Sequence, residues 1–147
     1  MTSIWNASAR AALAGRFEKL TAETRPRWGQ FTVGKMVQHC ADGIRMAVGE
    51  LAVKPKDGPL RLPVLKQLII YVLPWPKGAP TAPELIPASD PNLSVAIAGL
   101  KSGLFRLGAL EPAYVLAEHP AFGKLSRSAW GVLIHRHLDH HLKQFGL

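Results

Sequence analysis

Prolines concentrated in the middle of the chain limit its fold more than any other feature. Nine of the 12 prolines lie between residues 55 and 91 of the 147-residue chain. Proline lacks a backbone N–H and fixes φ, so a stretch this rich in proline forms neither a long regular helix nor a central strand. A connection of this length inside a compact domain usually covers something or is partly mobile. We therefore expect a long irregular connection, interrupted by one short apolar helix over residues 64–73.

Four longer segments flank this connection and have helical periodicity. Apolar residues recur at helical spacing in residues 6–20, 32–51, 89–108 and 126–144. Thr32 and Ser126 are suitable N-caps for the second and fourth segments. The third is predicted to open at Ser89 or Asp90, with Pro91 in its first turn. No segment shows the alternation of a strand, so the chain is predicted to be all-α, a four-helix bundle forming a single domain over residues 1–147.

The last segment carries two histidines on its apolar face. With Trp130 as the reference and about 100° per residue, His137 lies at about −20° and His141 at about +20°. His135 falls on the face expected to be exposed, and His140 falls at the edge. A lone buried histidine is usually satisfied by a backbone carbonyl, but two stacked imidazoles need partners for four ring nitrogens and would repel if both were charged. A shared metal ion resolves both requirements.

A third histidine, His39, belongs to the second segment and lies at the edge of its wide apolar arc. Helix geometry permits an inward His39 but does not demand it. Cys40, the only cysteine, falls near the middle of the arc and is predicted to be a core residue rather than a nucleophile. Asp42, one turn beyond His39, is a candidate to orient its imidazole. His119 is predicted to have a structural role in its loop.

Four short motifs occur in an order and separation that fit a known family. They are MVQHCAD at residues 36–42, HLDHHLKQ at 137–144, WG at 28–29 and HPAFG at 119–123. With these motifs nearly the whole chain resembles the DinB-like superfamily, four-helix bundles that include the YfiT-type metalloenzymes and several thiol-dependent transferases. The last two motifs resemble a less-studied branch of unknown function. The resemblance implies that His39, His137 and His141 are the ligands of a divalent metal.

Such a site would hold one divalent transition metal, with Zn, Ni, Fe and Mn all open. Three neutral imidazoles leave the ion its full charge, so it can act as a Lewis acid and lower the pKa of bound water or thiol. No Glu follows His137 as in a His-Glu-x-x-His motif, so peptide hydrolysis is disfavoured. The resemblance implies hydrolysis of a small electrophilic substrate, or transfer to it of an external low-molecular-weight thiol. The alternative is a non-catalytic bundle, a binding or interaction protein with a structural or vestigial metal site.

The composition of the chain limits the classes of partner that we expect. The net charge is +8, but the basic residues are scattered and not interleaved with aromatic residues, so we expect a small-molecule substrate and no nucleic acid. The longest apolar run, residues 65–75, is far shorter than the roughly 20 residues of a membrane span, so we expect no membrane partner. A single cysteine and the lack of a secretory signal suit a cytoplasmic protein. A homodimer stays open.

Overall fold

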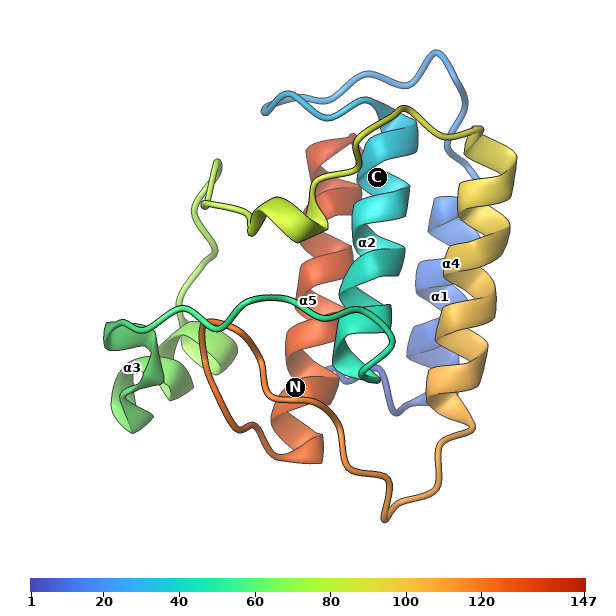
Figure 1. Ribbon diagram of the computed structural model, residues 1–147. Coiled ribbons are helices and arrows are strands. Elements are labelled where there is room, and N and C mark those ends of the chain that lie inside the picture. Colours follow the sequence, from blue (N-terminus) through green and yellow to red (C-terminus); the bar gives the residue numbers. More distant parts are fainter.

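The computed structural model describes residues 1–147 and contains helices but no strands (Figure 1). The four long helices are α1 (Ala7–Phe17), α2 (Val33–Ala47), α4 (Leu93–Gly108) and α5 (Arg127–Gln144). α2 packs against α4 and α5, and α1 packs against the same two helices. The prediction of an all-α fold is confirmed.

Each long helix begins after a residue whose side chain accepts a hydrogen bond from a backbone N–H of the first turn. These N-caps are Asn6, Thr32, Asn92 and Ser126. Thr32 and Ser126 were predicted and are confirmed, whereas the predicted start of α4 at Ser89 or Asp90 is wrong. Asp90 instead accepts a hydrogen bond from the Thr32 hydroxyl (2.7 Å), which ties the end of the proline-rich connection to the start of α2.

α2 also ends earlier than predicted, at Ala47 rather than at residue 51. Gly49 has φ +81°, a left-handed conformation that glycine adopts without a steric penalty. The N–H of Glu50 then bonds to the carbonyl of Arg45 (2.8 Å), which closes the last turn of the helix.

The connection between α2 and α4 contains four short elements. They are η1 (Pro59–Arg61), α3 (Pro63–Gln67), the π-helix η2 (Leu68–Val72) and η3 (Pro83–Leu85). α3 and η2 together account for the predicted short helix, and they lie to one side of the long helices (Figure 1).

Arg136 of α5 attaches this segment to the long helices. Its guanidinium donates to the carbonyls of Ile69 (3.0 Å) and Ile70 (2.7 Å) in η2 and of Leu73 (2.6 Å) directly after it. Trp75 Nε1 also donates to the carbonyl of Ile69 (3.1 Å). The same guanidinium lies 5.5 Å from the ring centroid of Trp75. One side chain therefore holds both the end of η2 and the tryptophan that follows it.

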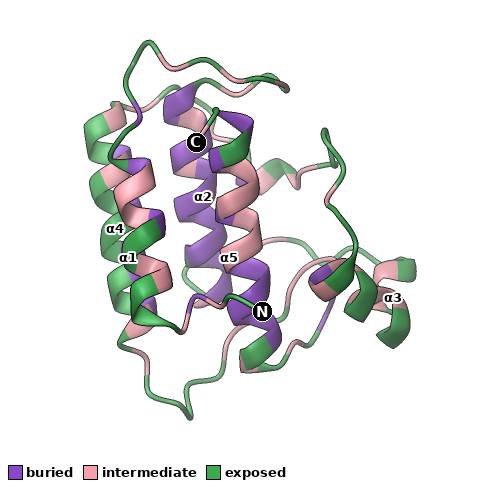
Figure 2. Cartoon of the chain, turned by 180° about the vertical axis from the view of Figure 1, so that it is seen from behind, coloured by how far each residue is buried: buried purple, intermediate pink, exposed green.

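The core lies between the four long helices, and α2 and α5 are its most buried members (Figure 2). Its largest fully buried side chains include Phe17 of α1, Met36 of α2, Leu100 of α4, and Trp130 and Leu138 of α5. In contrast, Ile70 is the only buried residue of the α3–η2 segment. None of the helices has the length and apolar composition that a membrane-spanning helix requires.

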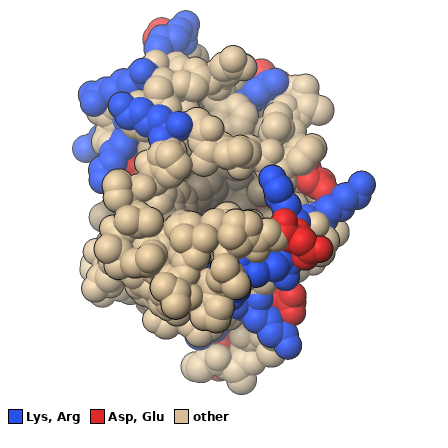
Figure 3. All heavy atoms as spheres, turned by 90° about the vertical axis from the view of Figure 1, so that its left-hand side faces the viewer, with Lys and Arg blue, Asp and Glu red and all other residues tan.

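A cavity of about 1460 Å³ lies between α2, α5 and the proline-rich connection. Its wall includes Trp28, Phe31 and Trp75, together with Pro74, Pro76, Pro80 and Pro83. On the side of the molecule that carries α3, the surface is hollowed within an area that bears few charged side chains (Figure 3). The connection therefore forms one wall of a cavity whose other wall is the two buried helices.

Candidate metal centre

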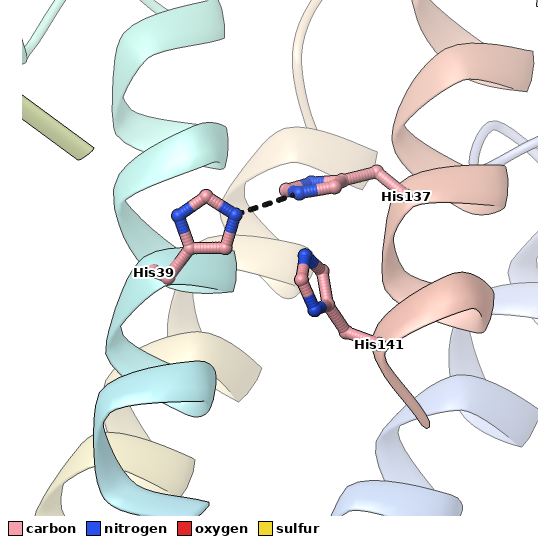
Figure 4. Close-up of side chains that lie close together, drawn as sticks. All are labelled: His39, His137 and His141. Carbon is pink, nitrogen blue, oxygen red and sulfur yellow. Dashed lines mark hydrogen bonds between the residues drawn. The ribbon is translucent and has the colours of Figure 1, made fainter. Parts of the chain in front are cut away.

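Three histidines from α2 and α5 meet at the wall of this cavity (Figure 4). His39 projects from α2, and His137 and His141 project from successive turns of α5. One ring nitrogen from each lies within 4.8 Å of the other two, and the ring centroids are 4.8–4.9 Å apart. The prediction that His137 and His141 share the inward face of their helix is confirmed, and the tertiary structure brings His39 to them.

His39 is held by a backbone carbonyl on the proline-rich connection. Its Nδ1 lies 2.8 Å from the carbonyl oxygen of Leu85 in η3, and because a carbonyl can only accept, Nδ1 carries the proton. The neutral ring therefore presents the lone pair of Nε2 to the other histidines. His39 itself is 4% exposed, which limits its freedom to rotate.

The expectation that Asp42 orients His39 is wrong. The Asp42 carboxylate accepts hydrogen bonds from Gln38 (3.0 Å) and Arg45 (3.0 Å) on its own helix. The carbonyl of Leu85, 46 residues away in sequence, takes the Nδ1 proton instead. Spacing along one helix could not reveal this partner, because it comes from the irregular connection.

His141 is oriented by Gln144, one turn further along α5. The Gln144 amide nitrogen donates to the carbonyl of Trp28 (2.8 Å), so its oxygen faces His141 and accepts from Nδ1 (2.7 Å). The lone pair of His141 Nε2 is therefore free. Gly29 makes this approach possible, since a Cβ there would lie 2.5 Å from the Gln144 amide nitrogen. Gln144 belongs to the motif of the last helix, and no role was predicted for it. Its position three residues after His141, one helical turn away, is the sequence signal for this contact.

His137 completes the cluster. Its Nε2 lies 2.9 Å from Nε2 of His39 (Figure 4). Because His39 Nε2 is an acceptor in its neutral tautomer, His137 Nε2 carries the shared proton. Gly43 of α2 faces the ring, and a Cβ at Gly43 would come within 3.3 Å of it. If this proton moves to Nδ1 of His137, the Nε2 lone pairs of all three neutral rings become available to one cation.

The three rings are held in their neutral form. Burial lowers the pKa of His39, and it lowers the pKa of His141 to about 3, with a further contribution from the nearby His39. Burial, followed by the proximity of His141 and His39, holds the pKa of His137 well below its ordinary value. At neutral pH the cluster therefore offers uncharged nitrogen donors, which is the form that binds a metal ion.

The donor set fits a divalent transition metal. Imidazole nitrogens suit Zn, Ni and Fe, and two of the three rings have their outer nitrogen fixed by a protein acceptor, as is usual for metal-bound histidine. One nitrogen from each of the three rings lies within 4.8 Å of the others, so the three could serve as ligands of a single ion after small side-chain adjustments. Three protein ligands facing a cavity also leave coordination positions for a substrate.

The other histidines lie outside the cluster. His135 and His140 are partly buried, and His140 lies on the cavity wall between Trp28 and Trp75, with ring centroids 5.8 and 6.0 Å away. His119 pins its loop as predicted, since its Nδ1 accepts from the N–H groups of Ala121 (3.1 Å) and Phe122 (3.2 Å).

Cys40 is a core residue, as predicted. Its side chain is fully buried, and its Sγ lies 3.8 Å from the sulfur of Met36. Burial raises the pKa of the Cys40 thiol strongly, so the group stays protonated and unreactive.

The fold and the site define an all-helical protein with a candidate three-histidine metal centre. A family model described as "Protein of unknown function (DUF1569)" matches residues 7–146, which include all four long helices and the three histidines. The chain therefore belongs to this family. No curated protein and no solved structure shows a significant match to the chain.

Proposed function

We propose that this protein is a metal-dependent enzyme of the DinB-like four-helix-bundle type. His39, His137 and His141 hold one divalent transition metal, and the substrate is a small electrophile that occupies the adjoining cavity. The reaction is hydrolysis of the electrophile or transfer to it of a low-molecular-weight thiol. The observation that carries the proposal is the convergence of neutral imidazoles, with two outer nitrogens fixed by Leu85 and Gln144, at the wall of a large cavity.

The chemistry of the donor set supports a Lewis acid. Three uncharged ligands leave a divalent ion its full positive charge, so when bound it lowers the pKa of water or a thiol that it contacts. The protein contributes the three imidazoles and, from Trp28, Phe31 and Trp75, apolar surface on the cavity wall. Any thiol must come from outside, because the buried Cys40 is the only cysteine.

The nature of the wall supports a small, largely apolar substrate. Aromatic and proline side chains are prominent among the lining residues, and the only Lys, Arg, Asp or Glu residues that line the cavity are Lys54, Lys56 and Glu84. Glu84 accepts a hydrogen bond from the backbone of Lys54, so part of this charge is already paired. The scattered basic surface of the remaining chain gives no support to a nucleic-acid partner.

The proposal is tested with protein purified without a polyhistidine tag. We expect about one equivalent of a transition metal per chain, and metal-dependent consumption of an electrophile from a panel of activated esters and alkyl halides, with and without added thiols. Activity that needs the thiol indicates transfer, and activity without it indicates hydrolysis. Cys40→Ala should leave either activity intact.

Two negative results have different meanings. If the untagged protein binds none of the four candidate metals, the metal centre itself is wrong. If metal binds through the three histidines but no electrophile on the panel is consumed, the non-catalytic alternative, a binding protein with a structural metal site, becomes the better description.

A further inference from the structure

The α3–η2 segment carries apolar side chains that nothing in the chain covers. We call this surface the outer face and define it by Leu62, Val64, Leu68, Val72 and Leu73. Val64 is 73% exposed and Val72 67%. Both line a shallow, open groove together with Pro63, Gln67, Leu68 and Tyr71. The groove joins Val64, Leu68 and Val72 into one continuous surface, with Leu62 and Leu73 at the two ends of the segment in sequence.

Such clustering is unusual for a protein surface. Single exposed apolar residues need no explanation, whereas contiguous exposed patches mark interaction sites. Five of the 11 exposed large apolar residues of the chain fall within residues 62–73. The segment also lies to one side of the long helices, where it is accessible to a partner (Figure 1).

Basic side chains accompany the outer face. Residues 54–77 contain five Lys or Arg and one Asp, a net charge of +4: the basic residues are Lys54, Lys56, Arg61, Lys66 and Lys77. Lys54 and Lys56 also line the cavity, and Lys77 lies 4.7 Å from the Trp28 ring, so Arg61 and Lys66 are the two nearest the outer face in sequence. Lys124 joins them, because Lys66 Nζ donates to its backbone carbonyl (3.1 Å). Of these six, only Arg61 forms an ion pair, with Asp57 at 3.6 Å. The side of the molecule that carries α3 shows a broad uncharged area, with Lys and Arg gathered at its upper left and Lys and Arg mixed with Asp and Glu along its right-hand margin (Figure 3).

The outer face adjoins the cavity. Leu60, Ile69 and Leu73 of the same stretch line the cavity that holds the three histidines. Leu73 belongs to both surfaces, since it is 43% exposed. The stretch of residues 60–73 therefore contributes both to the cavity wall and to the outer face.

We propose that the outer face docks on an anionic lipid surface. Its apolar side chains lie among the lipid chains at the interface, and the surrounding lysines and arginine lie against anionic headgroups. A second copy of this chain fits less well, because a symmetric contact would bring two segments of charge +4 together. The expectation of no membrane partner depended on the lack of a spanning run, and a surface contact needs none. Docking is independent of the proposed metal chemistry.

The test is co-sedimentation of the full chain with vesicles. We expect binding to vesicles of phosphatidylcholine mixed with phosphatidylglycerol, weak or no binding to pure phosphatidylcholine, and loss of binding as salt is added. Val64→Ser combined with Val72→Ser should weaken binding about tenfold or more, because it removes apolar surface from the contact. The matched control is Val95→Ser combined with Val115→Ser, which are 68% and 87% exposed outside the outer face and should bind as the unsubstituted chain does.

All four valines are exposed, so neither double variant should unfold, and circular dichroism checks this. Equal binding by the two double variants, or no preference for anionic vesicles, overturns the proposal. Sedimentation velocity tests the alternative partner, a second copy of the chain, by measuring whether the protein forms a dimer. A dimer that Val64→Ser with Val72→Ser abolishes, in a protein that binds no vesicles, would assign the outer face to a second copy of the chain instead.

Discussion

The histidine cluster and the α3–η2 segment adjoin the same cavity but are held in place in different ways. His39 and His141 each have an outer nitrogen bonded to a protein acceptor, and both belong to long helices that are buried along one face. The α3–η2 segment buries only Ile70, and the carbonyls at its end accept hydrogen bonds from two side chains, Arg136 and Trp75. The first region is supported by many contacts and the second by few.

This difference indicates that the geometry of the histidine cluster depends on the packed long helices, whereas access to the cavity depends on the α3–η2 segment. A cluster on packed helices keeps its shape because any movement would disturb the core. A segment with few buried apolar contacts can open locally at a much lower free energy. Substitutions in one region should therefore leave the other largely unchanged.

The largest effect is expected for His137→Ala. It removes one of the three histidines of the cluster, whose ring centroids are all 4.8–4.9 Å apart. If the cluster holds the metal, metal content should fall to background while circular dichroism stays helical. The measurement is elemental analysis of untagged protein. His135→Ala is the matched control, because His135 lies on the same helix but outside the cluster, and it should keep full metal content. Full occupancy in His137→Ala, or loss in His135→Ala, would contradict the assigned face of α5.

Arg136→Ala should affect the α3–η2 segment rather than the histidine cluster. Loss of three charge-assisted hydrogen bonds to the carbonyls of η2 should destabilise the α3–η2 segment locally by about 3 kcal/mol or more. In the unsubstituted chain we expect limited proteolysis to cut first within residues 74–91, and Arg136→Ala should add rapid cleavage within residues 62–75. Metal content should not change. If Arg136→Ala loses metal as His137→Ala does, the two regions are coupled and the comparison fails.

The free energy of unfolding should decrease as the pH is lowered, in part because His119 becomes protonated. His119 does not belong to the histidine cluster. Burial lowers the pKa of His119 to about 4, against an ordinary value of 6.5, so the unfolded chain binds a proton that the folded chain does not. The stabilising contribution is complete above pH 6.5 and is lost as pH falls toward 4, up to about 3 kcal/mol. Urea unfolding at several pH values measures it.

His119→Asn is the matched variant for this prediction. An asparagine oxygen can replace Nδ1 as the acceptor for the N–H groups of Ala121 and Phe122, but it does not titrate. The free energy of unfolding of His119→Asn should depend less on pH between 6.5 and 4. An unchanged pH dependence would show that His119 is not the group responsible.

A smaller effect is expected for Gln144→Leu. It removes the acceptor that fixes the tautomer of His141 and should lower metal affinity about 10- to 100-fold without abolishing binding. Competition with a chromophoric chelator measures the affinity. Gln144→Glu retains an acceptor oxygen, so its metal affinity should fall less. Gln67→Leu, on the exposed α3, should leave the metal affinity unchanged. Equal affinities in all four proteins would remove Gln144 from the site.

Much of the helical framework could be predicted because helix signals are local. Thr32 and Ser126 are N-caps as expected, and the positions of His137 and His141 on α5 follow from 3.6 residues per turn. The start of α4 was missed because two candidate caps compete there, and Asn92 forms the cap while Asp90 bonds to Thr32. The π-helical form of η2 was missed because the partner of its carbonyls, Arg136, is more than 60 residues away.

By itself the sequence determined where the long helices lie, that the proline-rich stretch between them is irregular, and that two histidines face inward. These properties depend on backbone chemistry and on spacing within one helix. The tertiary structure alone decided that His39 joins the pair, that Leu85 rather than Asp42 orients it, and that α3 and η2 leave an apolar face uncovered. Each of these outcomes depends on contacts between distant segments, which form only when the whole chain packs and which no local spacing encodes.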